Sequence, residues 1–256
     1  MIRPLNLGIL FALILTTAVT ALILQTIKSR NFAQITEQER SVLHAEIRSY
    51  ILENPKIIFE AVAIVRQREE EAQSNNDDQL VQDFKEDLFE DGYSYIGGNL
   101  DGDITVVEFL DYRCGYCRKA FAEVEKLLSE DDNIRFVIKE YPILGEASIL
   151  ISQFAIAIKQ LHGSDAYKMI HDTLIAFTGE PTPESLAEIA LTFGFEIDPI
   201  FERMISEEVL REINATRTLG EKMQISGTPT FVIENKLLRG YISLEVMRAI
   251  TAAQRG

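Results

Sequence analysis

Two cysteines separated by two residues are the part of this chain best suited to chemistry. Cys114 and Cys117 are the only cysteines among 256 residues, and they lie in the stretch DYRCGYCR at residues 111–118. Two thiols at this spacing can form a redox-active dithiol, half of a metal site or a structural disulfide. The elements around the cysteines decide which of these uses the sequence favours.

A strand before the cysteines and a helix after them are predicted from the apolar pattern. Residues 104–110, ITVVEFL, are nearly continuous in apolar and β-branched side chains, which indicates a buried strand. Residues 117–128 place apolar side chains on one face of a helix. Cys114 therefore lies at the helix start, where unpaired amide groups and the helix dipole favour a thiolate. Cys117 lies one turn further in, is more shielded, and is expected to resolve a mixed disulfide by attacking Cys114.

A metal site and a structural disulfide are the alternatives to a redox pair. A zinc site needs two more ligands, but the chain has no other cysteine. Its three histidines, His44, His162 and His171, lie far away in the sequence, and His171 is expected at the surface or the edge of the core. The order of strand, cysteine pair and helix favours the redox dithiol, and neither a metal nor another cofactor is expected.

The chain after the cysteines predicts an α/β fold with a helical insertion. Residues 133–142 are a second predicted strand, parallel to the first because a helix crosses between the two. Residues 147–223 are a long helical stretch of three to five helices. The chain then returns to two short strands within residues 228–240, and a last helix follows Ser243, a suitable N-cap. This globular domain is expected to cover residues 92–256.

The first thirty residues, 1–30, form a separate segment that is either a membrane anchor or a signal peptide. Residues 5–24 carry no charged side chain, and twenty helical residues reach about 30 Å, the hydrocarbon thickness of a bilayer. The alternative is cleavage after Ala21, which suits Arg3 and a short apolar centre. With either an anchor or a signal peptide, the rest of the chain is expected to be exported. The cysteines would then lie in an oxidising compartment, where a disulfide can form and turn over.

Residues 36–90 predict an acidic helical stalk before the globular domain. Apolar residues recur at helical spacing on both sides of a break at Asn54-Pro55, and residues 74–79 predict a second break or a frayed linker. Residues 37–91 hold fifteen acidic and six basic residues, which is −9 of the net charge of −15. The apolar stripes pack either on the globular domain or on copies of themselves in an oligomer. So acidic a chain argues against a nucleic-acid partner.

Four stretches of the chain resemble one protein family. These are residues 101–121 around the cysteines, residues 135–157, residues 227–250 with the sequence GTP, and residues 48–62. They are similar to the DsbA-like thioredoxin-fold thiol–disulfide oxidoreductases, in particular the ScsC/Com1-like branch exported by Gram-negative bacteria. The similarity covers about residues 40–254. It implies a thioredoxin fold with an inserted helical subdomain, a periplasmic location with possible inner-membrane anchoring by the first segment, exported client proteins with cysteines, and a membrane redox partner.

The resemblance also implies roles for individual residues. Cys114 matches the nucleophile of the family and Cys117 its resolving cysteine. Thr228 matches the residue before a cis proline, Pro229, although an ordinary trans turn is the alternative. Glu108 matches a buried acid that helps to move the proton of the resolving cysteine, and a solvent-facing carboxylate is the alternative. The substrate-binding surface that the resemblance implies comprises Tyr116, Gly227 and Thr228.

The dipeptide between the cysteines departs from the DsbA pattern. DsbA-like enzymes carry Pro-His there, whereas Gly115-Tyr116 with threonine before the proline is similar to disulfide isomerases such as DsbC. Tyr116 lacks the charge by which an imidazole stabilises the thiolate, so isomerase or reductase chemistry is favoured over a pure oxidase. An oligomer through residues 36–72, with a trimer favoured, would place several catalytic heads around one client. The alternative is a non-catalytic surface or scaffold protein that keeps the fold.

Overall fold

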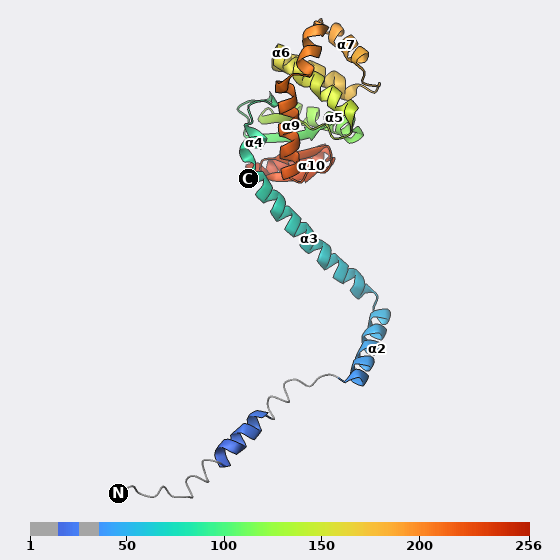
Figure 1. The fold of residues 1–256 in the computed structure, drawn as a ribbon, viewed down its shortest axis with the longest axis vertical. Coiled ribbons are helices and arrows are strands. Elements are labelled where there is room, and N and C mark those ends of the chain that lie inside the picture. Colours follow the sequence, from blue (N-terminus) through green and yellow to red (C-terminus); the bar gives the residue numbers. More distant parts are fainter. Residues whose placement is uncertain (1–14, 26–35) are drawn as a thin grey trace, which may run out of the picture. The chain divides into compact units, whose positions relative to one another are not determined.

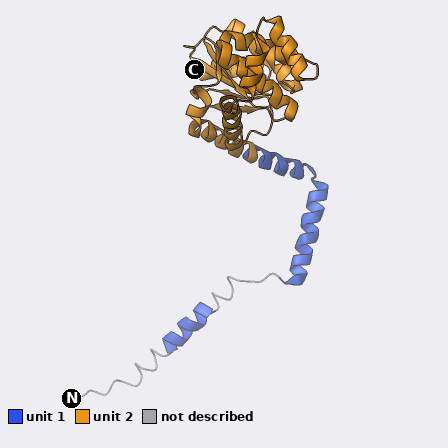
Figure 2. Ribbon diagram, turned by 45° about the horizontal axis from the view of Figure 1, so that its top comes forward, with its two compact units in different colours: residues 1–68 blue, residues 69–256 orange. Residues whose placement is uncertain are grey.

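The protein forms two compact units along its chain, residues 1–68 and residues 69–256 (Figure 2). The computed structural model describes residues 15–25 and 36–256. The unit boundary falls inside the segment that the sequence predicts as a stalk.

The apolar segment predicted at residues 5–24 is described only from residue 15 onward. Residues 15–25 are helical, and the predictions for residues 1–14 lie outside the described residues. In the two described ranges, none of the helices combines the length and the apolar character needed to cross a membrane.

The stalk begins as two helices, α2 (Glu37–Glu53) and α3 (Lys56–Asp83). Thr36 and Glu39 close the start of α2 with a capping box, and the chain leaves the helix at Asn54, the residue before Pro55. No residue of α2 is buried. The apolar side chains exposed on these helices are Val42, Leu43, Ile47, Tyr50, Leu52, Ile58, Phe59, Val62, Ile64 and Val65.

The break predicted at residues 74–79 is wrong, because α3 continues through it to Asp83. The polar residues that suggested a linker are held by partners distant in sequence. Asp77 pairs with Arg239 at 2.7 Å, and Asp78 pairs with Lys236 at 2.5 Å. A run rich in Asn and Asp is weakly helical by itself, so these contacts with the second unit's sheet stabilise the helix end.

The second unit is a mixed sheet with helices on both of its faces (Figure 1). After α3 its elements are α4 (Lys85–Phe89), β1 (Tyr95–Gly98), β2 (Ile104–Leu110), α5 (Gly115–Glu130), β3 (Ile134–Glu140), α6 (Glu146–Ala176), α7 (Pro183–Thr192), α8 (Ile197–Met204), α9 (Glu207–Lys222), β4 (Thr230–Ile233), β5 (Lys236–Arg239) and α10 (Leu244–Arg255). The predicted α/β fold and its helical insertion, α6 to α9, are confirmed.

The strand order β1-β3-β2-β4-β5 places β2 in the middle of the sheet. β2 and β3 are parallel, with Glu108 opposite Ile138, which confirms the predicted crossover through α5. The other strand pairs are antiparallel. Because β2 is covered on both faces, nearly all of its side chains are buried, and its sequence is almost continuously apolar.

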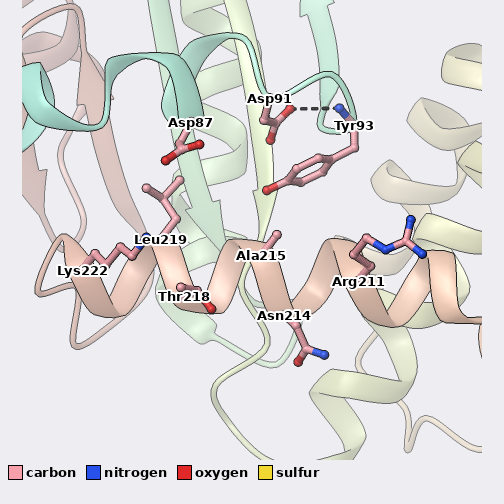
Figure 3. Close-up of a pocket in the computed structure, with 9 residues that line it drawn as sticks. All are labelled: Asp87, Asp91, Tyr93, Arg211, Asn214, Ala215, Thr218, Leu219 and Lys222. Carbon is pink, nitrogen blue, oxygen red and sulfur yellow. Dashed lines mark hydrogen bonds between the residues drawn. The ribbon is translucent and has the colours of Figure 1, made fainter.

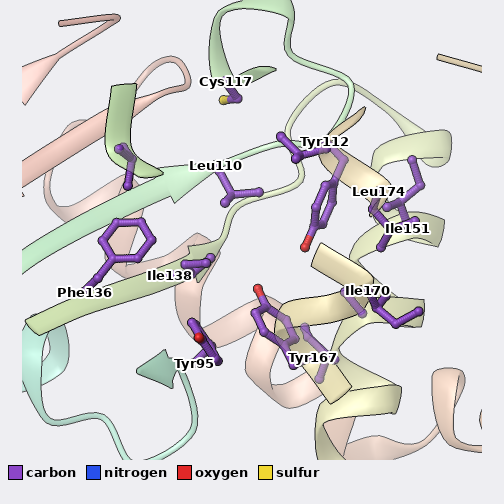
Figure 4. Close-up of a cluster of buried hydrophobic side chains, with 14 of the residues drawn as sticks. Tyr95, Leu110, Tyr112, Cys117, Phe136, Ile138, Ile151, Tyr167, Ile170 and Leu174 are labelled. Atoms are coloured by element: carbon purple, nitrogen blue, oxygen red, sulfur yellow. The ribbon is translucent and has the colours of Figure 1, made fainter. Parts of the chain in front are cut away.

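Each face of the sheet has its own apolar core. One core lies under α5, α6 and α10, and its members include Leu110, Cys117, Ile138, Ile151, Tyr167 and Leu174 (Figure 4). The other core lies under the end of α3, α4 and α9, and its members include Val81, Leu88, Val107, Phe109, Tyr141 and Leu219. The cysteine pair therefore belongs to the first face of the sheet.

We expect Gly220→Ala to destabilise the second unit. Gly220 lies on α9 directly over Tyr141, and an added Cβ would lie 2.5 Å from the tyrosine ring. The ring is held in place by a hydrogen bond from its hydroxyl to the Ile225 carbonyl, 3.0 Å away. Such overpacking costs about 1–3 kcal/mol of unfolding free energy, measured by urea denaturation. Thr218→Ala, at an exposed position of the same helix, is the control. Equal stability of the two variants would contradict this packing.

Candidate active site

Asp111 fixes the loop that carries the first cysteine. Its side chain is fully buried, and one carboxylate oxygen accepts the amide of Arg113 at 2.8 Å. The other oxygen accepts the amides of Ile143 and Leu144 at 2.9 and 3.0 Å. The Asp111 carbonyl accepts the amide of Cys114 at 2.9 Å. One buried carboxylate thereby joins the end of β2 to the loop after β3 and sets the position of Cys114.

The two cysteines differ in their place on α5. Cys114 is the N-cap, with extended backbone angles, and Cys117 lies in the first turn of the helix. Both thiols are free. Cys114 keeps 8% of its surface exposed and Cys117 keeps 1%. An attacking sulfur must be reached from outside, so the exposed fractions favour Cys114 as the nucleophile.

Hydrogen bonds at the helix start stabilise the thiolate of Cys114. The largest contribution comes from the thiol of Cys117, and the pKa of Cys114 falls to about 5. Partial burial opposes this shift, while Thr228 and the amides of Cys117 and Tyr116 act in the same direction as the thiol. A thiol with this pKa is ionised at neutral pH and is also a good leaving group.

Cys117 is shifted in the opposite direction. Burial strongly raises the pKa of Cys117, and its hydrogen bond to Cys114 and the charge of Glu108 raise it further. Only one sulfur of the pair is therefore an anion in the reduced protein. Cys117 needs a proton acceptor before it can attack.

The predicted cis bond between Thr228 and Pro229 is confirmed, and this loop faces the cysteine. The Thr228 carbonyl lies 3.1 Å from Cys114 Sγ, where it accepts a hydrogen bond from the protonated thiol. The buried Thr228 hydroxyl has no hydrogen-bond partner among the described residues, so it is available to donate to the thiolate. The Gly227 carbonyl accepts a bond from Thr230 Oγ1 at 2.8 Å and is occupied within the loop.

Glu108 is buried on β2, on the same face of the sheet as the cysteines. It keeps 4% of its surface exposed, so the alternative of a solvent-facing carboxylate is wrong. Burial raises the pKa of Glu108 to about 8, and the negative charge of Cys114 adds to the shift. A carboxylate with this pKa can take up and release a proton near neutral pH. Tyr116, by contrast, is 65% exposed beside the cysteines.

A buried polar network next to the cysteine loop was not expected from the sequence. The Glu140 carboxylate accepts hydrogen bonds from Tyr112 at 2.8 Å, Tyr167 at 2.6 Å and Ser152 at 2.7 Å. In Figure 4 the hydroxyl groups of Tyr112 and Tyr167 point toward each other. Burial raises the pKa of Glu140 to about 7, and the three hydroxyl donors oppose that shift. The network ties the residue two before Cys114 to α6.

His171 belongs to this network, so its predicted place at the surface or core edge is wrong. It is 3% exposed, and its Nδ1 lies 3.0 Å from the Tyr112 hydroxyl. Burial lowers the pKa of His171 to about 3, which keeps the ring neutral. The sequence signal available for this network was an acidic residue, Glu140, at the end of a buried strand, followed by an apolar helix that contains one tyrosine, Tyr167.

A cavity of the second unit lies apart from the cysteines. A cavity of about 410 Å³ lies between α9 and the segment around β1, and Figure 3 shows Asp91 and Tyr93 facing α9 across it. Asp91 is engaged by the ammonium of buried Lys139 at 2.5 Å. The lining of this cavity includes neither cysteine. Within residues 15–25 and 36–256, no three Cys, His, Asp or Glu side chains are grouped to hold a metal ion.

Known protein families match both parts of the chain. A family model described as thioredoxin matches residues 90–252, and a model described as the N-terminal domain of the copper resistance protein ScsC matches residues 39–72. A thioredoxin-like oxidoreductase from Silicibacter pomeroyi DSS-3 is 35% identical, with a TM-score of 0.62, over 67% of this chain and 98% of its own. The thiol-disulfide exchange protein alpha-DsbA2 from Wolbachia pipientis is 25% identical, with a TM-score of 0.66, over 72% of this chain and 98% of its own.

Among curated proteins, the chain matches one part of a longer sequence. It is 28% identical over 163 residues to the Na(+)/H(+) antiporter NhaA 1 from Salinispora arenicola. The match covers 63% of this chain but only 25% of that protein, so the chain spans about a quarter of this relative's length.

The cysteine pair at the start of α5 and the cis proline facing it are the features that the resemblance in the sequence implied. The thioredoxin model alone covers more than half of the chain. The chain therefore belongs to the thioredoxin family, in the group of the DsbA-like and ScsC-like oxidoreductases.

Proposed function

We propose that this protein is an envelope thiol–disulfide oxidoreductase that acts as a disulfide isomerase on exported proteins. The observation that carries the proposal is the unequal placement of its two thiols: Cys114 is the partly exposed N-cap of α5 beside the cis-proline loop, whereas Cys117 is buried in the first turn. The pKa of Cys114 is lowered and that of Cys117 is raised in accord with this placement. A structural disulfide or a metal site needs no such asymmetry. Thiol–disulfide exchange needs one sulfur that attacks and a second that is held back.

The reaction begins with attack of the Cys114 thiolate on one sulfur of a client disulfide. A bond forms between Cys114 and that sulfur, the client S–S bond breaks, and the second client sulfur leaves as a thiolate. In isomerisation another client thiolate then attacks the mixed disulfide and releases Cys114. In reduction Cys117 attacks Cys114 instead, so the two enzyme sulfurs become oxidised and the client leaves as a thiolate.

Glu108 accepts the proton of Cys117 in the resolving step. Cys117 stays protonated in its buried site unless a base removes the proton, and Glu108 is a buried carboxylate whose charge acts on Cys117. Deprotonated Glu108 takes up the proton as Cys117 attacks.

Thr228 contacts Cys114 from the proline loop, where the Thr228 backbone can pair with an extended client segment beside Pro229.

Isomerisation is favoured over pure oxidation by the dipeptide between the cysteines. Tyr116 adds an aromatic surface but no positive charge near the thiolate, and Thr228 precedes the proline.

We place the protein in the periplasm, reached through the predicted export segment, with a membrane redox partner that returns the dithiol to its starting redox state. Exposed apolar side chains on α2 and α3 support a homo-oligomer, a trimer by preference, through residues 36–72.

Removing either sulfur tests the assigned roles. Cys114→Ala is expected to reduce disulfide exchange to the uncatalysed rate, because no thiolate remains to attack. Cys117→Ala is expected to accumulate mixed disulfides with client proteins, because the resolving sulfur is gone; non-reducing gels with mass spectrometry detect them. Retained turnover in Cys114→Ala would contradict the role of Cys114 as the nucleophile. Wild-type protein that is inert toward scrambled ribonuclease would instead favour a non-catalytic scaffold.

Glu108→Gln is expected to slow the resolving step by about 100-fold, the scale of general base catalysis. Because an acid loses its proton as the pH rises, the fraction of Glu108 able to accept a proton grows toward its pKa of about 8. The wild-type release rate should therefore climb between pH 6 and about 8, and this climb should be lost in the variant. Stopped-flow release of a peptide from the mixed disulfide measures it. Glu188→Gln, at an exposed site on α7, is the control. An unchanged pH profile in Glu108→Gln would remove this role.

Deleting residues 1–74 tests the oligomer. The full chain is expected to scatter light as a trimer and the shortened chain as a monomer, because the exposed apolar stripes are removed. Alkylation of Cys114 at an unchanged rate would show that the catalytic unit is intact. The shortened protein is also expected to refold scrambled ribonuclease more slowly per cysteine pair. An oligomeric mass after the deletion would place the interface elsewhere.

A further inference from the structure

Tyr241 contacts three side chains that form a stripe along the first turns of α5. Its ring lies 6.4 Å, between centroids, from that of Tyr116, and the ammonium of Lys119 lies 4.0 Å from its centroid. Its hydroxyl donates a hydrogen bond to Glu123 at 2.8 Å. Residues three and four apart share one face of a helix, so Tyr116, Lys119 and Glu123 lie in line. One residue from the far end of the chain thus orders the stripe that starts beside Cys114.

Tyr241 is also joined to the proline loop on the other side of Cys114. The amide of its neighbour Gly240 donates to the Pro229 carbonyl at 3.0 Å. The other carboxylate oxygen of Glu123 accepts the amide of Leu244, the first residue of α10. Tyr241 is therefore linked both to the proline loop that faces Cys114 and to α5, the helix that begins at Cys114.

Lys119 is an available cation in this position. It is exposed, and among the residues that the structure describes no carboxylate lies within ion-pair distance of its ammonium. The nearby Arg113 differs, because it has Glu180 at 3.8 Å and the Gly179 carbonyl at 3.2 Å. In a chain with a net charge of −15, the start of α5 thus presents an unpaired ammonium that shares the ring of Tyr241 with exposed Tyr116.

We infer that Tyr116, Lys119 and Tyr241 form a recognition surface for clients that carry an acidic residue next to the reacting cysteine. This inference rests on the proposed function, since it names the substrates that the same site prefers. The ammonium attracts a carboxylate on the client, and the tyrosine rings give its neighbouring side chain an apolar surface. The ring of Tyr241 holds the ammonium in place through a cation–π contact, which reduces the entropy lost when a client binds.

Three synthetic peptides test the preference. They differ only in the residue after their single cysteine, which is Glu, Gln or Lys, and each cysteine carries 2-nitro-5-thiobenzoate as a mixed disulfide. The Cys114 thiolate attacks the peptide sulfur, a new S–S bond joins enzyme and peptide, and 2-nitro-5-thiobenzoate leaves as a coloured thiolate. Cys117→Ala of the full chain is used, so that the reaction stops at this step. The second-order rate constant is measured for each peptide at low and high salt.

The Glu peptide is expected to react about two- to fivefold faster than the Gln peptide, the range of an exposed ion pair, and the Lys peptide more slowly still. High salt should reduce these differences. Lys119→Met should remove the preference, and Lys119→Glu should reverse it. Tyr241→Ala should weaken it, whereas Tyr241→Phe, which keeps the ring, should retain it. Lys126→Met, at an exposed site further along the same helix, is the matched control.

The outcomes separate this inference from the function on which it rests. Equal rates for the three peptides, or a preference that survives in Lys119→Met, would overturn the recognition surface while leaving the exchange reaction intact. If every peptide reacted with the enzyme no faster than it reacts with a free thiol in solution, the proposed function itself would be overturned. Iodoacetamide alkylation at a pH well above the pKa of Cys114 checks that each variant keeps an accessible thiolate.

Discussion

The hydrogen bond from the Cys117 thiol to the Cys114 sulfur is the interaction on which this site depends. It is the largest single cause of the low pKa of Cys114, and it also raises the pKa of Cys117. The same contact therefore produces one thiolate and one protected thiol from two identical side chains. Burial decides the direction, because the more exposed sulfur can carry the charge at lower cost.

The fold maintains this contact from three sides. Asp111 binds the amide of Arg113 in the cysteine loop and an amide of the loop after β3, and α5 supplies the amides around the thiolate. The cis-proline loop brings the Thr228 carbonyl and hydroxyl to the third side. Behind the cysteines, the network around Glu140 anchors Tyr112 to α6, so the loop is fixed to the helical insertion as well as to the sheet.

Local patterns in the sequence predicted the parts of this structure that depend on local rules. The continuous apolar run of β2, the N-cap at Ser243 and the cysteine pair at a helix start all follow from neighbouring residues. The break predicted at residues 74–79 was wrong because Asp77 and Asp78 are paired with Arg239 and Lys236, more than 150 residues away. Such pairs leave no local signal.

The same limit applies within the site. The resemblance to a known family pointed to Pro229 and Glu108, but Asp111, His171 and Tyr241 act through contacts between distant segments. A buried histidine and an exposed one have the same sequence signal when both follow apolar residues on a helix. Chain topology brings Tyr241 beside α5, and no spacing rule connects residues 241 and 119.

The most direct test of the central contact is the ultraviolet absorbance of the thiolate at 240 nm, followed against pH in the reduced protein. We expect a midpoint near pH 5 for wild type and a midpoint moved clearly upward in Cys117→Ala, where the largest stabilising bond is lost. A wild-type midpoint near the free-thiol value of about 8.5, or no change in Cys117→Ala, would contradict it.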